Sequence, residues 1–377
     1  MSAGTDKRKE GYRLMKGVHL TKKQIALALS GLLALLLVPE IQHLHPDIRV
    51  TTVYFGLCWG LAAVGLNLLL RHMELVSFGH AAYFGGGAYG AALATQYLGI
   101  EHGVLLIITG VLLATSLAVL IGWLVAGYLD IYFALLTLAF NQLLFAIVMG
   151  SSEWLGSDDG LGVRPGGQRP TLLEFLPFEF QLRAYYFLIV VLVVVLVVTW
   201  RLINSPFGRA LDAIGQNRTR AQFIGIPVDR YVWMTFIMSG IYGGLAGGMY
   251  GIMQGHVRPG NTLFVLRSGE ILFMTILGGL GTLIGPILGG IVLTYLLTEL
   301  RFTTEFWEFY TGLVLLFVVF VLPKGILGSS GDIVTGAQNR VRNPGQLRED
   351  TSILRAKASE SVQNAIRTTK VILFGVK

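Results

Sequence analysis

Residues 185–200 read YYFLIVVLVVVLVVTW, residues 205–229 read SPFGRALDAIGQNRTRAQFIGIPVD, and residues 231–251 read YVWMTFIMSGIYGGLAGGMYG. The two outer runs are apolar over about 20 residues, the length a helix needs to cross roughly 30 Å of hydrocarbon. The middle stretch is polar and basic and carries helix-start and helix-stop residues. The alternation predicts two membrane-spanning helices joined by a short helical connection outside the hydrocarbon.

The composition extends this interpretation to the whole chain. Of its 377 residues, 53% are hydrophobic and 14% are charged, whereas about a quarter of the residues in soluble domains are charged. Forty-eight glycines suit membrane helices, where small residues let backbones approach closely. Cys58 is the single cysteine, which excludes an intrachain disulfide. We predict an all-α polytopic membrane protein.

Ten apolar segments can be counted along the chain. An even number of crossings places both termini on the same side of the membrane. Their predicted ranges are 25–39, 50–70, 77–98, 104–128, 131–150, 185–203, 231–255, 270–281, 285–300 and 306–323.

The placement of positive charge predicts the orientation. The N-terminal stretch 1–24 carries seven Lys/Arg and two acids, and the tail 324–377 carries nine and four. The loop 204–230 carries four arginines and two aspartates, whereas the loop 151–183 carries five acids and three arginines. The first three regions are therefore expected in the cytoplasm and the acidic loop outside, around a transmembrane domain spanning 25–323. The same placement argues against nucleic acid as the reason for the net charge of +7.

The eighth and ninth segments are expected to form a broken or re-entrant pair. The sequence GGLGTLIGP at 278–286 holds four glycines and a proline. Pro286 suits the first turn of a new helix and is poor inside one. A helix over 271–281 would be only about 16 Å long, too short to span alone. The alternative is one kinked helix, with an uncounted crossing elsewhere.

Matching glycine-rich stretches suggest that the chain is built from two inverted halves. SFGHAAYFGGGAYG occupies 77–90 in the third segment, and GGLGTLIGPILGG occupies 278–290 across the eighth and ninth. Five segments per half would invert the second half relative to the first. Paired, interrupted segments of this kind are typical of a transport path, although close packing of membrane helices explains the glycines equally well.

The connection at 205–229, here called the elbow, predicts a helix–turn–helix. Ser205 is a good N-cap and Pro206 a good first residue. Gly215 permits a turn, and a second short helix at about 218–224 ends at Gly225. Such an element can dock in a groove of another protein or lie on lipid as an interfacial helix. One face of the first helix carries the apolar residues Phe207, Ala210, Leu211 and Ile214.

The elbow resembles the cytoplasmic coupling loop of ABC-importer permeases, especially the branched-chain amino acid permease family. The resemblance covers about residues 50–328, in family order, and is closest to the second of that family's two permease subunits. The supporting motifs are GLNLLLRHMELVSFGHAAYFGGGAYGAAL (65–93), YFALLTLAFNQLLF (132–145), DDGLGV (158–163), SGEILFMTILGGLGTLIGPILGG (268–290) and VLPKGILG (321–328).

This resemblance implies a permease subunit of the cytoplasmic (inner) membrane. It implies a heterodimer with a second permease subunit, two cytoplasmic ATPase subunits, an external solute-binding protein, and branched-chain or other neutral amino acids as solutes. One departure is clear: the family's loop pattern has Glu-Ala-Ala six residues before a glycine, and this chain has Thr219, Arg220 and Ala221 before Gly225. The resemblance implies ATPase coupling through Phe207, Gly208, Arg209, Ala210, Leu211, Ile214 and Gly225.

The chain itself lacks the motifs of an enzyme. It has no GxxxxGK[ST] loop, so ATP would be used by partner subunits and no cofactor is expected here. No metal site is expected either.

Polar residues at membrane depth are candidates for a substrate path, because burying them in hydrocarbon is costly. For the amide side chains the alternative is interhelical hydrogen bonding, for His80 it is helix packing, and for Glu270 it is stabilisation of a helix N-terminus. The candidates are Asn67, Ser77, His80, Asn141, Gln142 and Glu270.

The functional alternatives are an importer of the same type that carries urea, amides or a sugar, and an ion-coupled secondary transporter. The latter should show coupling charges in mid-membrane, of which this chain has few.

Overall fold

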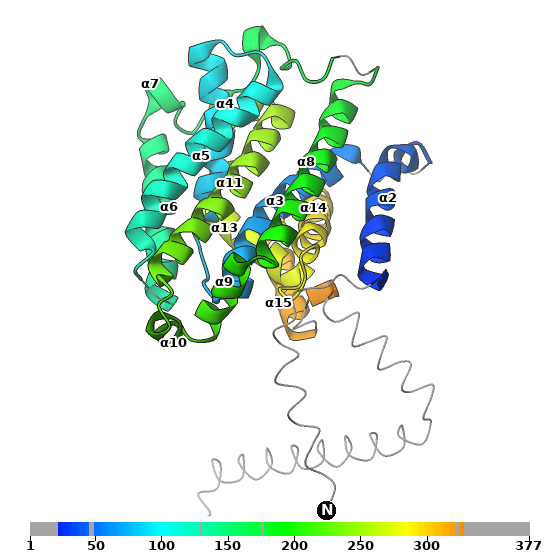
Figure 1. Cartoon of the computed structure of the whole chain (residues 1–377). Coiled ribbons are helices and arrows are strands. Elements are labelled where there is room, and N and C mark those ends of the chain that lie inside the picture. The colour runs from blue at the N-terminus through cyan, green and yellow to red at the C-terminus, as the bar shows by residue number, and fades with distance from the viewer. Residues whose placement is uncertain (1–21, 45–48, 129, 175–176, 322–324, 328–377) are drawn as a thin grey trace, which may run out of the picture. The chain divides into compact units, whose positions relative to one another are not determined.

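The described part of the chain is mostly helical (Figure 1). The computed structural model describes residues 22–44, 49–128, 130–174, 177–321 and 325–327. The chain divides into one unit up to Leu327 and a second from Gly328 to Lys377. The predicted tail 324–377 lies almost wholly outside the described residues, as does nearly all of the predicted tail 1–24.

Each of the ten predicted apolar segments coincides with a helix. Five of these helices are long and apolar enough to cross a membrane within the described residues: α3, α5, α6, α8 and α11. An all-α polytopic membrane protein is thus confirmed. The ten helices are α2 (Lys22–Leu44), α3 (Val50–Met73), α4 (His80–Leu98), α5 (Gly103–Val125), α6 (Asp130–Met149), α8 (Phe180–Ile203), α11 (Val228–Gln254), α13 (Val265–Gly278), α14 (Gly285–Thr303) and α15 (Trp307–Val321).

Several predicted boundaries need correction. Helix α2 continues through Pro39 to Leu44; the proline removes one backbone donor without ending the helix. Helix α4 begins at His80 rather than at residue 77. Helix α13 begins at Val265, five residues before the predicted start, so Glu270 lies in its second turn and not at its opening.

Small residues hold the centre of the bundle together. Helix α11 packs along α3, α4 and α5. A β-carbon at Gly247 would overlap the carbonyl oxygen of Phe84, and one at Gly87 would overlap the backbone of Gly244. Gly110 of α5 lies equally close to the Gly87 carbonyl. Backbones in direct contact account for much of the glycine content, as close packing of membrane helices requires.

Helices α13 and α14 form an antiparallel hairpin. Residues 279–284 between them are not helical, and Gly279 has φ +112°. Gly278 lies against Gly285, and Gly289 lies against the carbonyl of Met274. Pro286 stands in the first turn of α14, as predicted. The break is thereby confirmed and the single kinked helix is wrong, while the inverted relation of the two halves stays a prediction.

The elbow and the acidic loop lie at opposite ends of the bundle (Figure 1). The elbow holds α9 (Pro206–Gln216) and α10 (Arg218–Phe223) and leads directly into α11. The far end of α11 leads into β2 (His256–Val257), which pairs antiparallel with β1 (Leu161–Gly162) in the acidic loop. The remaining short elements are α7 (Ser152–Leu155), η2 (Pro165–Gly167) and α12 (Pro259–Thr262).

Candidate functional site

Two side-chain caps shape the elbow. The Ser205 hydroxyl accepts a hydrogen bond from the Phe207 N–H at 3.2 Å and starts α9. The Asn217 carboxamide oxygen accepts one from the Arg220 N–H at 2.9 Å and starts α10. Asn217 also makes the turn between the helices, with φ −165° and ψ 106°. The prediction that Gly215 makes this turn is wrong, because Gly215 lies inside α9.

The apolar face of α9 packs onto this chain's own bundle. Gly208, Leu211 and Ile214 are buried, and the side chains of Leu211 and Ile214 are completely covered. Leu211 and Ile214 share a cluster with Leu69 and Met73 of α3. Any role of the three buried residues in coupling is therefore indirect, through the helices they touch.

Phe207 and Ala210 are only partly covered. The Phe207 ring stacks on Tyr231 of α11, with ring centroids 5.2 Å apart. Ala210 is half-buried on the same side of α9. Phe207 thus joins the elbow to the start of α11, and both residues leave part of their surface open.

The outer side of the elbow presents a basic and apolar surface. Arg209 is exposed, and Gly225 has φ +87° with open space around it. Phe223 is 87% exposed and Ile224 is 75% exposed. We did not predict the last two as site residues, although two adjacent apolar residues just before a helix-ending glycine are a visible signal. Exposed apolar side chains beside arginines are typical of a surface that meets either a partner protein or the lipid interface.

A polar contact links the elbow to the end of α3. The imidazole Nδ1 of His72 lies 2.5 Å from the Asp212 carboxylate, with His72 buried and Asp212 half exposed. Gly215 lies against the His72 carbonyl, where a β-carbon would overlap it. Movement of α9 must therefore displace α3 or break this junction.

Arg218 adds an electrostatic link at the start of α10. Burial lowers the pKa of Arg218, and the carboxylates of Asp130 and Asp229 act in the opposite direction. A guanidinium is effectively always protonated in proteins. Asp130 and Asp229 stand in the first turns of α6 and α11, and the buried Nη1 and Nη2 of Arg218 have no hydrogen-bond partner among the described residues.

Two of the predicted path residues meet in the bundle interior. The His80 Nε2 lies 2.6 Å from the Ser239 hydroxyl of α11, and its Nδ1 lies 3.1 Å from the Ser77 hydroxyl. His80, Ser77 and Ser239 are all completely buried. This network satisfies both ring nitrogens and joins α4 to α11, so it supports the packing interpretation.

The predicted asparagines donate hydrogen bonds to connections next to α13. The Asn67 amide donates to the Thr282 carbonyl in the α13–α14 turn at 3.1 Å. The Asn141 amide donates to the Leu263 carbonyl ahead of α13 at 3.0 Å. These contacts favour the hydrogen-bonding alternative raised for both residues, while a role of either residue in a substrate path stays a prediction. Gln142, the next residue on α6, is half-buried.

Glu270 has a partner that sequence reasoning missed. The Arg267 Nη1 donates to both oxygens of the Glu270 carboxylate, at 2.8 and 2.7 Å. The two residues stand one turn apart on α13, the i, i+3 spacing that brings helix side chains together. Glu270 therefore forms an ion pair with Arg267, and it does not stand at the N-terminus of α13.

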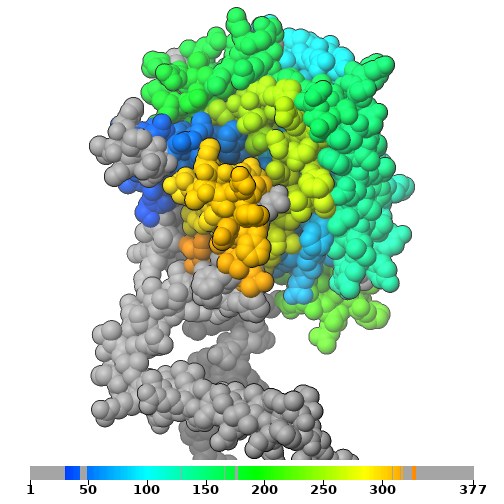
Figure 2. Space-filling view, turned by 180° about the vertical axis from the view of Figure 1, so that it is seen from behind, coloured from blue at the N-terminus to red at the C-terminus, as the bar shows by residue number. Residues whose placement is uncertain are grey.

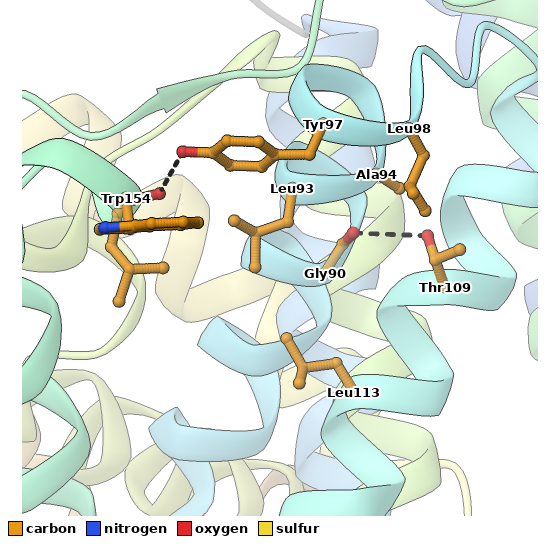
Figure 3. Close-up of a pocket in the computed structure, with 9 residues that line it drawn as sticks. Gly90, Leu93, Ala94, Tyr97, Leu98, Thr109, Leu113 and Trp154 are labelled. Atoms are coloured by element: carbon orange, nitrogen blue, oxygen red, sulfur yellow. Dashed lines mark hydrogen bonds between the residues drawn. The ribbon is translucent and has the colours of Figure 1, made fainter.

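An apolar pocket lies apart from these residues (Figure 3). It encloses about 570 Å³ between α4, α5 and α7, near the acidic loop. The Tyr97 hydroxyl donates to the Trp154 carbonyl at 3.0 Å, and the two rings stack 6.1 Å apart. Leu98 and Trp154 are largely exposed. The lining brings no charged group into the pocket, and none of the predicted site residues lies in it.

Close-packed apolar helices, buried polar contacts between them and a helical elbow at one end define a polytopic membrane permease. The chain belongs to the family described as branched-chain amino acid transport system / permease component, whose family model matches residues 48–322. It is thus a permease subunit of the ABC-importer type.

Permease proteins of known transport systems are similar in sequence to this chain. The chain is 25% identical over 289 residues to the high-affinity branched-chain amino acid transport system permease protein LivM of Escherichia coli K12, covering 71% of this chain and 67% of LivM. It is 23% identical over 293 residues to LivH of the same strain, covering 73% and 93%. A shorter match, 34% over 131 residues, joins it to the autoinducer 2 import system permease protein LsrC of Yersinia pseudotuberculosis, covering 33% and 37%. No solved structure is significantly similar to the chain.

Proposed function

We propose that this subunit carries branched-chain or other neutral amino acids inward across the cytoplasmic membrane. The observation that supports this most is the match to the permease family over residues 48–322, together with a bundle whose interior holds few charged groups. A solute with no net charge suits such an interior, because fixed charges there are costly and attract ions instead.

The proposed assembly contains four kinds of partner. A second permease subunit completes the pore, membrane lipid surrounds it, and two cytoplasmic ATPase subunits bind and hydrolyse ATP. An external solute-binding protein would deliver solute at the end that carries the β1–β2 ribbon. This chain would need no cofactor of its own.

The elbow is proposed to receive the ATPase. Arg209, Phe223 and Ile224 form its free surface, while Leu211 and Ile214 seat it on α3. Thr219, Arg220 and Ala221 occupy the positions of the family's Glu-Ala-Ala, so the contact here would rely on cationic and apolar groups rather than on a carboxylate. An acidic, apolar-lined groove is the complementary ATPase surface.

The proposed orientation puts the elbow and both termini in the cytoplasm. In a Cys58→Ala background, Phe223→Cys is expected to react with a membrane-impermeant maleimide only in inside-out vesicles. Trp154→Cys on α7 is the matched control and should react only in intact spheroplasts. Both parent side chains are well exposed, at 87% and 68%, so the labelling pattern reports sidedness. Labelling of Phe223→Cys from outside contradicts this orientation.

Uptake measurements test the function itself. The chain is to be expressed with the transport genes that neighbour it, and uptake of labelled leucine measured in competition with unlabelled isoleucine, urea and ribose. We expect isoleucine alone to compete, and an ATPase to co-purify. Competition by urea or ribose would support the alternative importer. Leucine uptake by the purified subunit without any ATPase would support the ion-coupled transporter.

A further inference from the structure

The Arg267–Glu270 pair lies in a place where ion pairs are costly. Its side chains are only 16% and 17% exposed. The neighbouring Ser268 hydroxyl accepts from the Ala81 N–H at the start of α4. Leu263, just ahead of α13, bonds Asn141 near the middle of α6. The pair is therefore at mid-length of the bundle, where charges are expensive and commonly functional.

The pair is also incompletely satisfied. Both contacts to the carboxylate use the same nitrogen, Nη1. The Nε of Arg267 is buried and has no hydrogen-bond partner. A guanidinium can hold a carboxylate with two parallel bonds, and this one leaves that capacity unused.

Aromatic side chains lie on the helix against which α13 packs. Tyr250 of α11 belongs to an aromatic cluster with residues of α3, and α13 packs against α3. Its ring contacts Phe55 and Trp59 of α3, with centroids 5.2 and 5.7 Å away. The helices that carry the pair and its neighbours contribute to one face of the bundle, where α13 and α14 appear in yellow and gold (Figure 2). The ion pair of α13 and the aromatic cluster between α3 and α11 thus lie on adjoining helices.

We propose that this pair binds the two charged groups of a zwitterionic amino acid during its passage. The Arg267 guanidinium receives the α-carboxylate, Glu270 receives the α-ammonium, and the aliphatic side chain lies against Tyr250 and Phe55. Charge stays balanced, because the ion pair within the protein is replaced by two ion pairs between the protein and the amino acid. The inference rests on the proposed function and names the charge pattern by which this path would select its solute.

If the pair served only to stabilise the fold, removing both charges together would leave leucine uptake unchanged. Replacing a buried ion pair by apolar residues of similar size is often neutral or stabilising, whereas removing one partner leaves an uncompensated charge. The double substitution Arg267→Met, Glu270→Leu therefore separates the two roles. We expect leucine uptake by the complete transporter to fall at least tenfold, with unchanged thermal stability, unchanged basal ATP hydrolysis and unchanged co-purification of the second permease.

Glu299→Leu on α14 is the matched control, because it removes an exposed carboxylate and should leave uptake unchanged. Undiminished uptake in the double variant would show that the pair only packs. Loss of co-purification would show that it contacts the second permease instead. Failure of the unsubstituted transporter to take up leucine would refute the proposed function and not the role of the pair.

Thiol protection gives an independent measurement. In the Cys58→Ala background, Leu266→Cys, one turn before Glu270 on α13 and 61% exposed in the parent, keeps both charges and should react with a small hydrophilic methanethiosulfonate in the assembled transporter. Saturating leucine during ATP turnover is expected to slow that reaction at least threefold. A rate unaffected by leucine, with uptake of the unsubstituted protein intact, overturns the proposal.

Discussion

The Gly247→Val substitution is expected to prevent the bundle from assembling. A β-carbon at this position overlaps the Phe84 carbonyl oxygen, so the backbones of α11 and α4 would have to separate. Overpacking that side chains can absorb costs about 1–3 kcal/mol, and a backbone clash at the helix centre should exceed this range. Detergent-solubilised protein measured by size-exclusion chromatography should lose its monodisperse peak.

Gly312→Val in α15 is the control for this substitution. Nothing lies within 4 Å of a β-carbon built at Gly312, so the same change in helix propensity occurs there without a clash. We expect the control to keep the monodisperse peak. An equal yield from both variants would mean that α4 and α11 do not touch through Gly247.

Helix positions could be predicted from the sequence because membrane helices are defined by length and hydropathy. The break before Pro286 could be predicted as well, since glycines and a proline are local signals. The partner of each helix could not be predicted in this way. The contact of Gly247 with Phe84 joins residues far apart in the chain, and any of the many glycines could have served there.

The candidate site was only partly predictable for the same reason. Periodicity shows that α9 has an apolar face, but not whether a partner or the chain itself covers it; Leu211 and Ile214 turn out to be covered by α3. The His72–Asp212 contact spans 140 residues, beyond any local pattern. Arg267 and Glu270, three residues apart on a helix, could have been recognised as a pair.

The Gly215→Val substitution is expected to uncouple ATP hydrolysis from transport. Gly215 lies against the His72 carbonyl at the end of α3, and Asp212 bonds the His72 side chain one turn earlier. A valine side chain would push α9 away from α3 and break this contact. In reconstituted transporter we expect ATP hydrolysis to persist, since the exposed surface of the elbow is unchanged, while leucine uptake falls by roughly two orders of magnitude, about 2.7 kcal/mol of lost coupling.

Two comparison variants show whether the effect arises at the α9–α3 junction or at the free surface of the elbow. Gln216→Val introduces the same side chain at the next position, which is exposed, and should leave uptake unchanged. Phe223→Ser with Ile224→Ser alters the free surface and should instead reduce ATPase co-purification, because it removes the exposed apolar contact proposed for the partner. If Gly215→Val transports normally, force does not enter the bundle through the α9–α3 junction. If it loses the ATPase, α9 itself is part of the docking surface and the two roles assigned to the elbow cannot be separated.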